Sequence, residues 1–221
     1  MSFRRVMRPV YTFIFILLLL AVASITVAVN IDTRMHRYDD NRWETAVEYL
    51  NECSAAAHVQ SIRYESYAER ADTDKARGTA RLFRALAHSE RVHERICAHA
   101  SRLFNGEYTP PTVMVKVNTP TRANIEKSLA YERRRLDVSA GLAAKRAIDA
   151  GNRYIARLMI WIDGSNRRHI EFLEKLSDSN SDDDIKYGVC PNCGNMYESR
   201  NCDVYCPFCQ THSSEFAVFG D

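Results

Sequence analysis

The stretch LFRALAHSERVHERI, residues 82–96, places ionisable groups in the middle of an otherwise apolar helical stripe. Phe83, Leu86, Glu90 and His93 recur every three or four residues, which puts them on one face of an α-helix. Burying a carboxylate or an imidazole without a partner is unfavourable by several kcal/mol. The stretch therefore predicts a core-facing helix whose glutamate and histidine are satisfied by other groups inside the protein.

Two further helical stripes carry polar groups in the same way. Glu132 lies on one of them, between Leu129 and Leu136, and Asn166 and His169 lie on another. Together with the helix before residue 82, these patterns predict four helices. They are expected to span residues 42–71, 73–104, 122–150 and 151–176.

The connections between these helices favour an antiparallel bundle. Residues 105–121 contain three prolines and a short β-branched run, so the helical pattern stops there. Short connections within each helix pair and this long one between the pairs are typical of a four-helix bundle with one crossover. We therefore expect a mainly α chain with a bundle over residues 40–177, followed by an acidic linker over residues 178–186.

The C-terminal segment, residues 187–221, carries the most specific motif in the chain. It contains two C-x-x-C pairs separated by 12 residues. Each pair places two thiolates on a tight turn, and two such turns can close a tetrahedral site for zinc or iron. Cys202 lies between the pairs and is not expected to be a ligand. The predicted ligands are Cys190, Cys193, Cys206 and Cys209.

The amino terminus, residues 1–31, contains an uncharged apolar run from Pro9 to Ile31. About 20 such residues are enough to cross a bilayer as a helix, so we predict a single-pass N-terminal transmembrane anchor. A cleaved secretory signal with a small-residue site at residues 21–23 is the alternative. Arginines flank the run on both sides and leave its orientation open.

The overall charge balance argues against a nucleic-acid partner. The formal net charge of the 221 residues is +2, and no phosphate-binding glycine-rich loop is present in the sequence. The arginine run at residues 133–135 is interpreted as mostly a solvated face. Cys53 and Cys97, on the core faces of the first two helices, are interpreted as small buried apolar residues.

The helices and the cysteine motif together resemble the rubrerythrin family, from about Trp43 to the end of the chain. In that family a ferritin-like four-helix bundle precedes a small knuckle of the rubredoxin or zinc-ribbon type. The helix at residues 82–96 resembles the family's first E-x-x-H helix, and ANIEKSLAYERRRLD, residues 123–137, resembles its G-E-x-x-E helix. The resemblance implies a metal site in the bundle formed by Glu90, His93, Glu132 and His169.

The same resemblance implies an activity and an assembly. Rubrerythrins hold two irons in the bundle and reduce hydrogen peroxide with electrons delivered by the knuckle iron. They also usually form homodimers, in which one subunit's knuckle lies near the bundle metals of the other.

Three positions depart from the family pattern. Ala57, Arg135 and Asn166 stand where carboxylate ligands are expected, so three negative charges are missing and one is replaced by a cation. A two-iron site carries roughly four positive charges and depends on about four carboxylates to balance and bridge them. The sequence therefore argues against full peroxidase activity and leaves open whether the protein is an enzyme.

The sequence allows three interpretations of the bundle site. A single iron or zinc ion could be bound by the two glutamates and two histidines. Alternatively, the bundle holds no metal, and the Arg135 guanidinium fills the space and pairs with Glu132 or Glu90. The third interpretation is a working two-iron site completed by Gln60, Glu65 or Glu52.

Two functions follow from these observations. The first is a membrane-bound redox protein that transfers electrons through an iron in the four-cysteine site. The alternative is a non-catalytic, membrane-tethered scaffold or partner-binding protein whose knuckle holds a structural zinc ion.

Overall fold

The structure of the protein is a computed structural model. In it the chain forms two compact units, residues 1–44 and 45–221. The residues described are 15–26, 43–115, 119–139, 141–178 and 185–220.

In the first unit, residues 15–26 form an α-helix with exposed side chains. Among the described residues, no helix is both long enough and apolar enough to cross a membrane. The remainder of the predicted anchor, residues 1–14 and 27–31, lies outside the described residues, so the prediction of a transmembrane helix finds no support in the structure.

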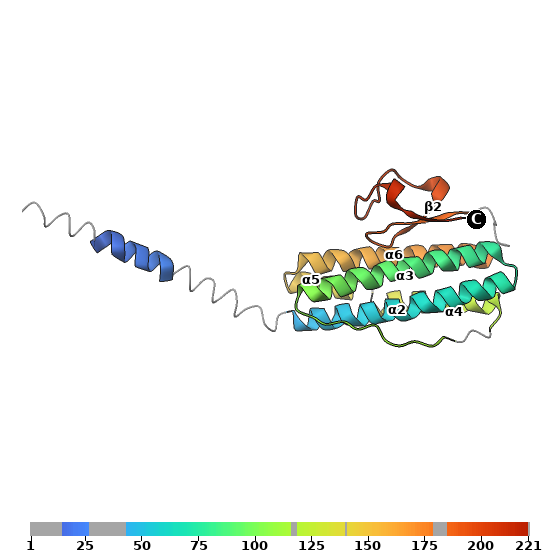
Figure 1. The fold of residues 1–221 in the computed structure, drawn as a ribbon, viewed down its shortest axis with the longest axis horizontal. Coiled ribbons are helices and arrows are strands. Elements are labelled where there is room, and N and C mark those ends of the chain that lie inside the picture. The colour runs from blue at the N-terminus through green and yellow to red at the C-terminus, as the bar shows by residue number, and fades with distance from the viewer. Residues whose placement is uncertain (1–14, 27–42, 116–118, 140, 179–184, 221) are drawn as a thin grey trace, which may run out of the picture. The chain divides into compact units, whose positions relative to one another are not determined.

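The second unit begins with the predicted helical bundle, which Figure 1 shows as long helices lying side by side. The first, second and last predicted helices are confirmed to within a few residues at each end. The helices are α2 (Glu44–Thr73), α3 (Arg77–Leu103), α4 (Thr121–Ser139), α5 (Leu142–Asp149) and α6 (Arg153–Asp178).

The single helix predicted over residues 122–150 is wrong, because the chain breaks it into α4 and α5. Gly141 lies between the two helices with a φ angle of +73°, in the left-handed region that side chains with a Cβ rarely adopt. Its backbone N–H donates to the Asp163 carboxylate of α6 at 2.9 Å. The helix is therefore interrupted at Gly141, and the apolar face of α5 packs against α6.

Two apolar clusters fill the bundle on either side of the buried polar groups. In one, the Tyr64, Tyr67 and Phe83 rings pack together, with ring centroids 5.4–6.5 Å apart. The other surrounds Leu50, Cys97 and several apolar residues of α5 and α6. The helices are thus fixed at both ends of the bundle, and the polar groups of α2, α3, α4 and α6 lie between the clusters.

The knuckle is a three-stranded antiparallel sheet with strand order β2-β1-β3. Its strands are β1 (Tyr187–Val189), β2 (Met196–Glu198) and β3 (Ala217–Phe219), with short 3-10 turns at Ser199–Asn201 and Ser213–Glu215. The knuckle lies over α3 and α6, as Figure 1 shows.

The knuckle packs closely against both helices. The Gly194 carbonyl accepts hydrogen bonds from the hydroxyls of Ser89 on α3, at 2.6 Å, and Ser165 on α6, at 3.1 Å. Gly164 of α6 leaves room for the Phe208 ring, since a Cβ at this glycine would lie 2.6 Å from the Phe208 Cζ atom. The turn at Gly194 therefore lies directly above the buried polar groups.

Replacing Gly194 with alanine tests this packing. The residue has a φ angle of +78°, and a Cβ there would lie 2.6 Å from the His93 Nε2 atom and 3.1 Å from the Ser89 carbonyl oxygen. Gly141→Ala is the matched control, because its φ angle is similar and a Cβ there meets nothing within 4 Å. Both substitutions should lose about 1–2 kcal/mol of stability from backbone strain. Gly194→Ala should lose about 1–3 kcal/mol more from overpacking.

Chemical denaturation of the two variants measures this difference. Equal losses would show that Gly194 does not pack against α3.

Candidate metal centres

The four predicted knuckle ligands come together at one point. The sulfur atoms of Cys190, Cys193, Cys206 and Cys209 all lie within 4.8 Å of one another. The Cys190–Cys209 and Cys193–Cys206 sulfur distances are 3.4 and 3.5 Å. A metal–sulfur bond of about 2.3 Å in a tetrahedral site requires sulfurs about 3.8 Å apart, so these two short pairs need to separate only slightly to fit zinc or iron. Cys202 lies outside this cluster.

Two similar turns position these cysteines. In each, the residue after the second cysteine, Gly194 or Gln210, has a positive φ angle and donates its N–H back to the carbonyl of the first cysteine. These hydrogen bonds are 3.0 Å to Cys190 and 2.8 Å to Cys206. The C-x-x-C spacing therefore folds both thiols of each turn toward the same side.

Hydrogen-bond donors surround the sulfurs. The Tyr197 hydroxyl is 3.3 Å from the Cys206 sulfur, and the Thr211 hydroxyl is 3.0 Å from the Cys209 sulfur. Hydrogen bonds from the Cys190 and Cys193 thiols lower the pKa of the Cys206 thiol. Hydrogen bonding within the cluster and burial raise the pKa of the Cys190 and Cys193 thiols, so the negative charge is favoured at Cys206. Thiolate is the form in which cysteine binds a metal ion.

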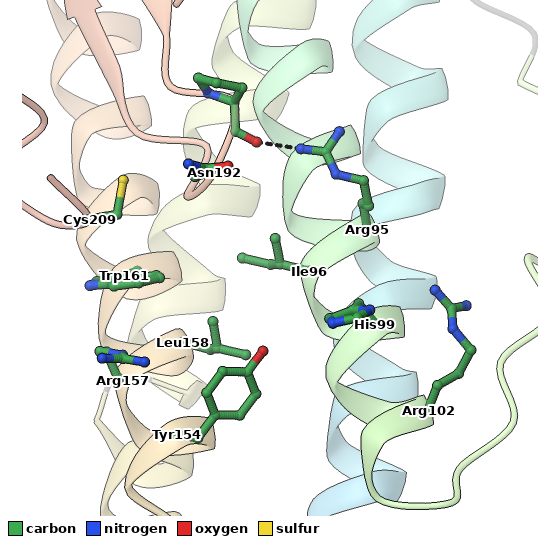
Figure 2. A pocket seen from close by; sticks show the side chains of 11 residues that line it. Arg95, Ile96, His99, Arg102, Tyr154, Arg157, Leu158, Trp161, Asn192 and Cys209 are labelled. Carbon is green, nitrogen blue, oxygen red and sulfur yellow. Dashed lines mark hydrogen bonds between the residues drawn. The ribbon is translucent and has the colours of Figure 1, made fainter. Parts of the chain in front are cut away.

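A cavity of about 570 Å³ opens beside Cys209, the one half-buried sulfur of the cluster. Figure 2 shows that α3 and α6 contribute opposite walls, with the turn carrying Asn192 at one end. Arg95, Arg102 and Arg157 line it, and none of the acidic side chains that the structure describes does. The Arg157 guanidinium lies 5.3 Å from the centre of the Trp161 ring. The cavity is thus cationic, has an aromatic wall, and reaches a knuckle ligand.

The second group of predicted ligands lies in the bundle beneath Gly194. Ligand atoms of Glu90 from α3, Glu132 from α4 and His169 from α6 lie within 4.8 Å of one another, and all three side chains are fully buried. The fourth predicted ligand, His93, is also buried, and its Nδ1 atom is 3.4 Å from Glu90 Oε2. The helices thus bring all four predicted residues to one place, with three of them in the tightest cluster.

Hydrogen bonding fixes the orientation of His169. Ser89 has one hydroxyl proton, and it donates that proton to the Gly194 carbonyl. The His169 Nε2 atom, 2.8 Å from the same hydroxyl, must therefore be the donor in that contact. Its Nδ1 atom then faces the Glu132 Oε1 atom at 3.4 Å and the Glu90 Oε1 atom at 3.7 Å. A lone pair facing two carboxylates is unfavourable, so Nδ1 is placed to bind a metal ion shared with Glu132 and Glu90.

Arg135 supplies a positive charge to the same cluster. Its Nη1 atom donates to Glu90 Oε1 at 2.8 Å, and its side chain is 13% exposed while that of Glu90 is fully buried. Burial alone would raise the pKa of the Glu90 carboxyl, but the Arg135 guanidinium and the His93 ring lower it to about 2. This is the contact predicted from the sequence by the interpretation in which Arg135 fills the place of a carboxylate ligand and pairs with Glu90. Arg135 is therefore not part of the solvated face expected for most of the arginine run.

The other glutamate has a neutral partner. The Tyr64 hydroxyl donates to Glu132 Oε1 at 2.7 Å, and burial together with this carboxylate raises the Tyr64 pKa well above its usual value. Within the described part of the chain, Glu132 Oε2 and His93 Nε2 have no hydrogen-bond partner. The cluster therefore retains unused ligand atoms.

The residues present do not fit a two-iron site. Ala57 is buried and offers no ligand, and neither amide atom of Asn166 has a partner among the described residues. Gln60 is buried but accepts a hydrogen bond from Arg63. Two glutamates, one already paired with arginine, leave too little negative charge for two irons.

Two more glutamates considered from the sequence lie elsewhere. Glu65 pairs with Arg91 at 2.7 Å on the surface, and Glu52 is exposed. Neither completes the bundle cluster.

Ser89 and Ser165 are two site residues that the sequence patterns did not indicate. Both are fully buried and join the bundle cluster to the knuckle through Gly194. Ser89 directly precedes Glu90, but nothing in the helical pattern indicates that a separate domain covers it.

Comparisons with known proteins agree with this architecture. The rubrerythrin family model matches residues 48–177. No curated protein sequence matches the chain. Nigerythrin in its fully reduced, all-ferrous state has a similar structure, with a TM-score of 0.71, 20% identity, and coverage of 78% of this chain and 86% of nigerythrin. Partially reduced nigerythrin gives the same values.

A bacterioferritin from Desulfovibrio desulfuricans, solved for its diiron site, is more distantly similar. Its TM-score is 0.51 at 17% identity, with 63% of this chain and 83% of that chain covered. At such identities these structural similarities establish the fold alone.

Replacing Arg135 with methionine should strongly destabilise the protein. The substitution leaves the buried Glu90 carboxylate without its cationic partner, which costs about 3–5 kcal/mol. Arg133→Met is the matched control, because Arg133 is 56% exposed and pairs with Glu174 on the surface. Loss of that pair should cost about 0–1 kcal/mol.

Urea unfolding of both variants at neutral pH measures the difference. Similar small losses would show that the Arg135–Glu90 pair does not hold the cluster together.

Proposed function

Because the chain belongs to the rubrerythrin family, we propose that it is a metal-binding redox protein that passes single electrons through iron in its four-cysteine site. The observation that carries the proposal is the convergence of four sulfur atoms within 4.8 Å, three buried and one, Cys209, half-buried beside a cavity. Iron bound there would supply a one-electron couple.

The surroundings of the sulfurs support electron transfer. Hydrogen bonds from Tyr197 and Thr211, together with backbone N–H groups of Asn192 and Cys193 to Cys190, stabilise the added negative charge of a reduced site. These donors thus stabilise the reduced form of the metal site, and they need not move when the charge of the site changes.

The cavity beside Cys209 supports a site of electron entry. Its arginines favour an anionic donor surface, and close approach to one ligand shortens the distance to the metal position. Another ligand of the cluster, Cys193, is followed in the chain by Gly194. The Gly194 carbonyl accepts hydrogen bonds from Ser89 and Ser165 of the bundle. Ser89 also contacts His169, so a continuous polar path joins the two candidate centres.

Two-iron peroxide reduction is not part of this proposal. Arg135 pairs with Glu90 where a further carboxylate would be needed, and Ala57 and Asn166 add no negative charge. A single iron or zinc ion at Glu90, Glu132 and His169 remains compatible with the residues present.

The second candidate function is a scaffold with a structural zinc knuckle. The close packing of Phe208 against Gly164 and the Gly194 contacts support it, because they join the knuckle to the bundle. In either case we propose that residues 1–31 tether the protein to a membrane and that it forms a homodimer. Protease protection on intact cells would establish which side of the membrane carries the bundle.

Metal content and the visible spectrum distinguish the two functions. Protein purified without added metal should be red and contain about one iron per chain. Cys206→Ser should abolish the colour, whereas Cys202→Ser, outside the cluster, should retain it. A colourless protein with one zinc ion per chain, which iron cannot replace, would contradict electron transfer and support the scaffold.

Restoring the missing carboxylates should restore iron binding by the bundle. The triple variant Ala57→Glu, Arg135→Glu and Asn166→Glu adds three carboxylates and removes the competing cation, so it should take up about two more irons per chain than the unmodified protein. Iron analysis of both proteins after anaerobic loading measures the gain. No gain in a folded variant would show that the vacated positions are not a former metal site.

A further inference from the structure

We propose that Cys53 of α2 and Cys97 of α3 are a redox-active dithiol that reduces hydrogen peroxide and closes to a disulfide. Their sulfur atoms are 3.2 Å apart, and the Cys97 thiol donates to the Cys53 sulfur. Both cysteines are free thiols. This activity would need no metal and is therefore independent of the function proposed for the knuckle.

The sulfur–sulfur distance favours bond formation. A disulfide bond is about 2.05 Å long, so the two atoms have to approach by little more than an ångström. They belong to neighbouring helices, and side-chain rotation together with a small helix shift can supply this movement. Two apolar residues at these positions would fill the space, but only a pair of cysteines can exchange electrons across it.

The surroundings make the two cysteines different from each other. Cys97 is fully buried, whereas Cys53 is partly exposed. The Arg135 guanidinium also hydrogen-bonds to the Cys53 sulfur. The Cys97 thiol and Arg135 lower the pKa of Cys53, while hydrogen bonding to Cys53 and burial raise that of Cys97. Cys53 is thus the residue placed to react first, and Cys97 the one placed to resolve the product.

The reaction balances without an additional cofactor. The Cys53 sulfur attacks one peroxide oxygen, an S–O bond forms, the O–O bond breaks, and the departing hydroxide takes up the Cys53 proton to become water. The Cys97 sulfur then attacks the Cys53 sulfur, the S–S bond forms, and the S–O bond breaks. The second hydroxide takes up the Cys97 proton, so two thiols and one peroxide give one disulfide and two waters. A dithiol reductant would regenerate both thiols by exchange.

Arg135 links this pair to the altered bundle site. The guanidinium lies between Glu90, which it neutralises, and Cys53, beside which it can stabilise the thiolate and the departing hydroxide. The arginine that opposes a two-iron site therefore provides the charge that a peroxide-reactive thiol requires.

The test uses the full chain loaded with zinc, so that the knuckle cysteines are protected and no iron can react. After brief exposure to one equivalent of hydrogen peroxide, the protein is alkylated and its peptides are mapped by mass spectrometry. We expect Cys53 and Cys97 to lose their reactivity toward the alkylating reagent together, to yield a peptide pair joined by a disulfide, and to recover after treatment with dithiothreitol.

Single variants test the order of the two steps. Cys97→Ser should accumulate a sulfenic acid at Cys53 that dimedone traps, whereas Cys53→Ser should consume peroxide at least 10-fold more slowly and give no adduct at Cys97. Cys202→Ser is the control and should behave as the unmodified protein does. The proposal would be overturned if the unmodified protein kept both thiols after peroxide treatment. It would also be overturned if Cys53 were oxidised no faster than Cys202.

Discussion

A carboxylate that is buried inside a helical bundle must be balanced by positive charge, and this requirement organises the centre of the protein. Glu90 is fully buried, and Arg135 meets it at 2.8 Å. In a two-iron bundle the metal ions would provide that positive charge. Here one side chain provides it instead, and the loss of carboxylates at Ala57 and Asn166 is consistent with the smaller charge to be balanced. The bundle keeps the ferritin-like fold while its central charges are arranged differently.

The same centre also supports the knuckle. Gly194 directly follows a metal-binding cysteine, and its carbonyl accepts hydrogen bonds from serines of α3 and α6. Because Ser89 is fixed by this contact, it also fixes the ring of His169. The geometry of the bundle cluster therefore depends on the presence of the knuckle, and the polar path between the two candidate centres is part of what stabilises the domain contact.

Much of this arrangement could be predicted from residue patterns. The period of three to four residues around Glu90 and His169 predicts core-facing helices, and the two C-x-x-C pairs predict the four-sulfur cluster. The break at Gly141 was not predictable in this way, because a single glycine within an apolar pattern does not reveal its φ angle. The contact of Gly194 with Ser89 could not be predicted either, because it joins segments that lie far apart in the sequence. The Cys53–Cys97 contact depends on how α2 and α3 align, whereas each sequence pattern describes only one helix.

Anomalous diffraction at the iron absorption edge, on crystals grown from iron-loaded protein, tests the central claim most directly. The account predicts one strong peak between the sulfurs of the knuckle, with the Arg135 guanidinium still paired to Glu90 in the bundle. Two peaks bridged by carboxylates between the helices, with Arg135 displaced from Glu90, would contradict it.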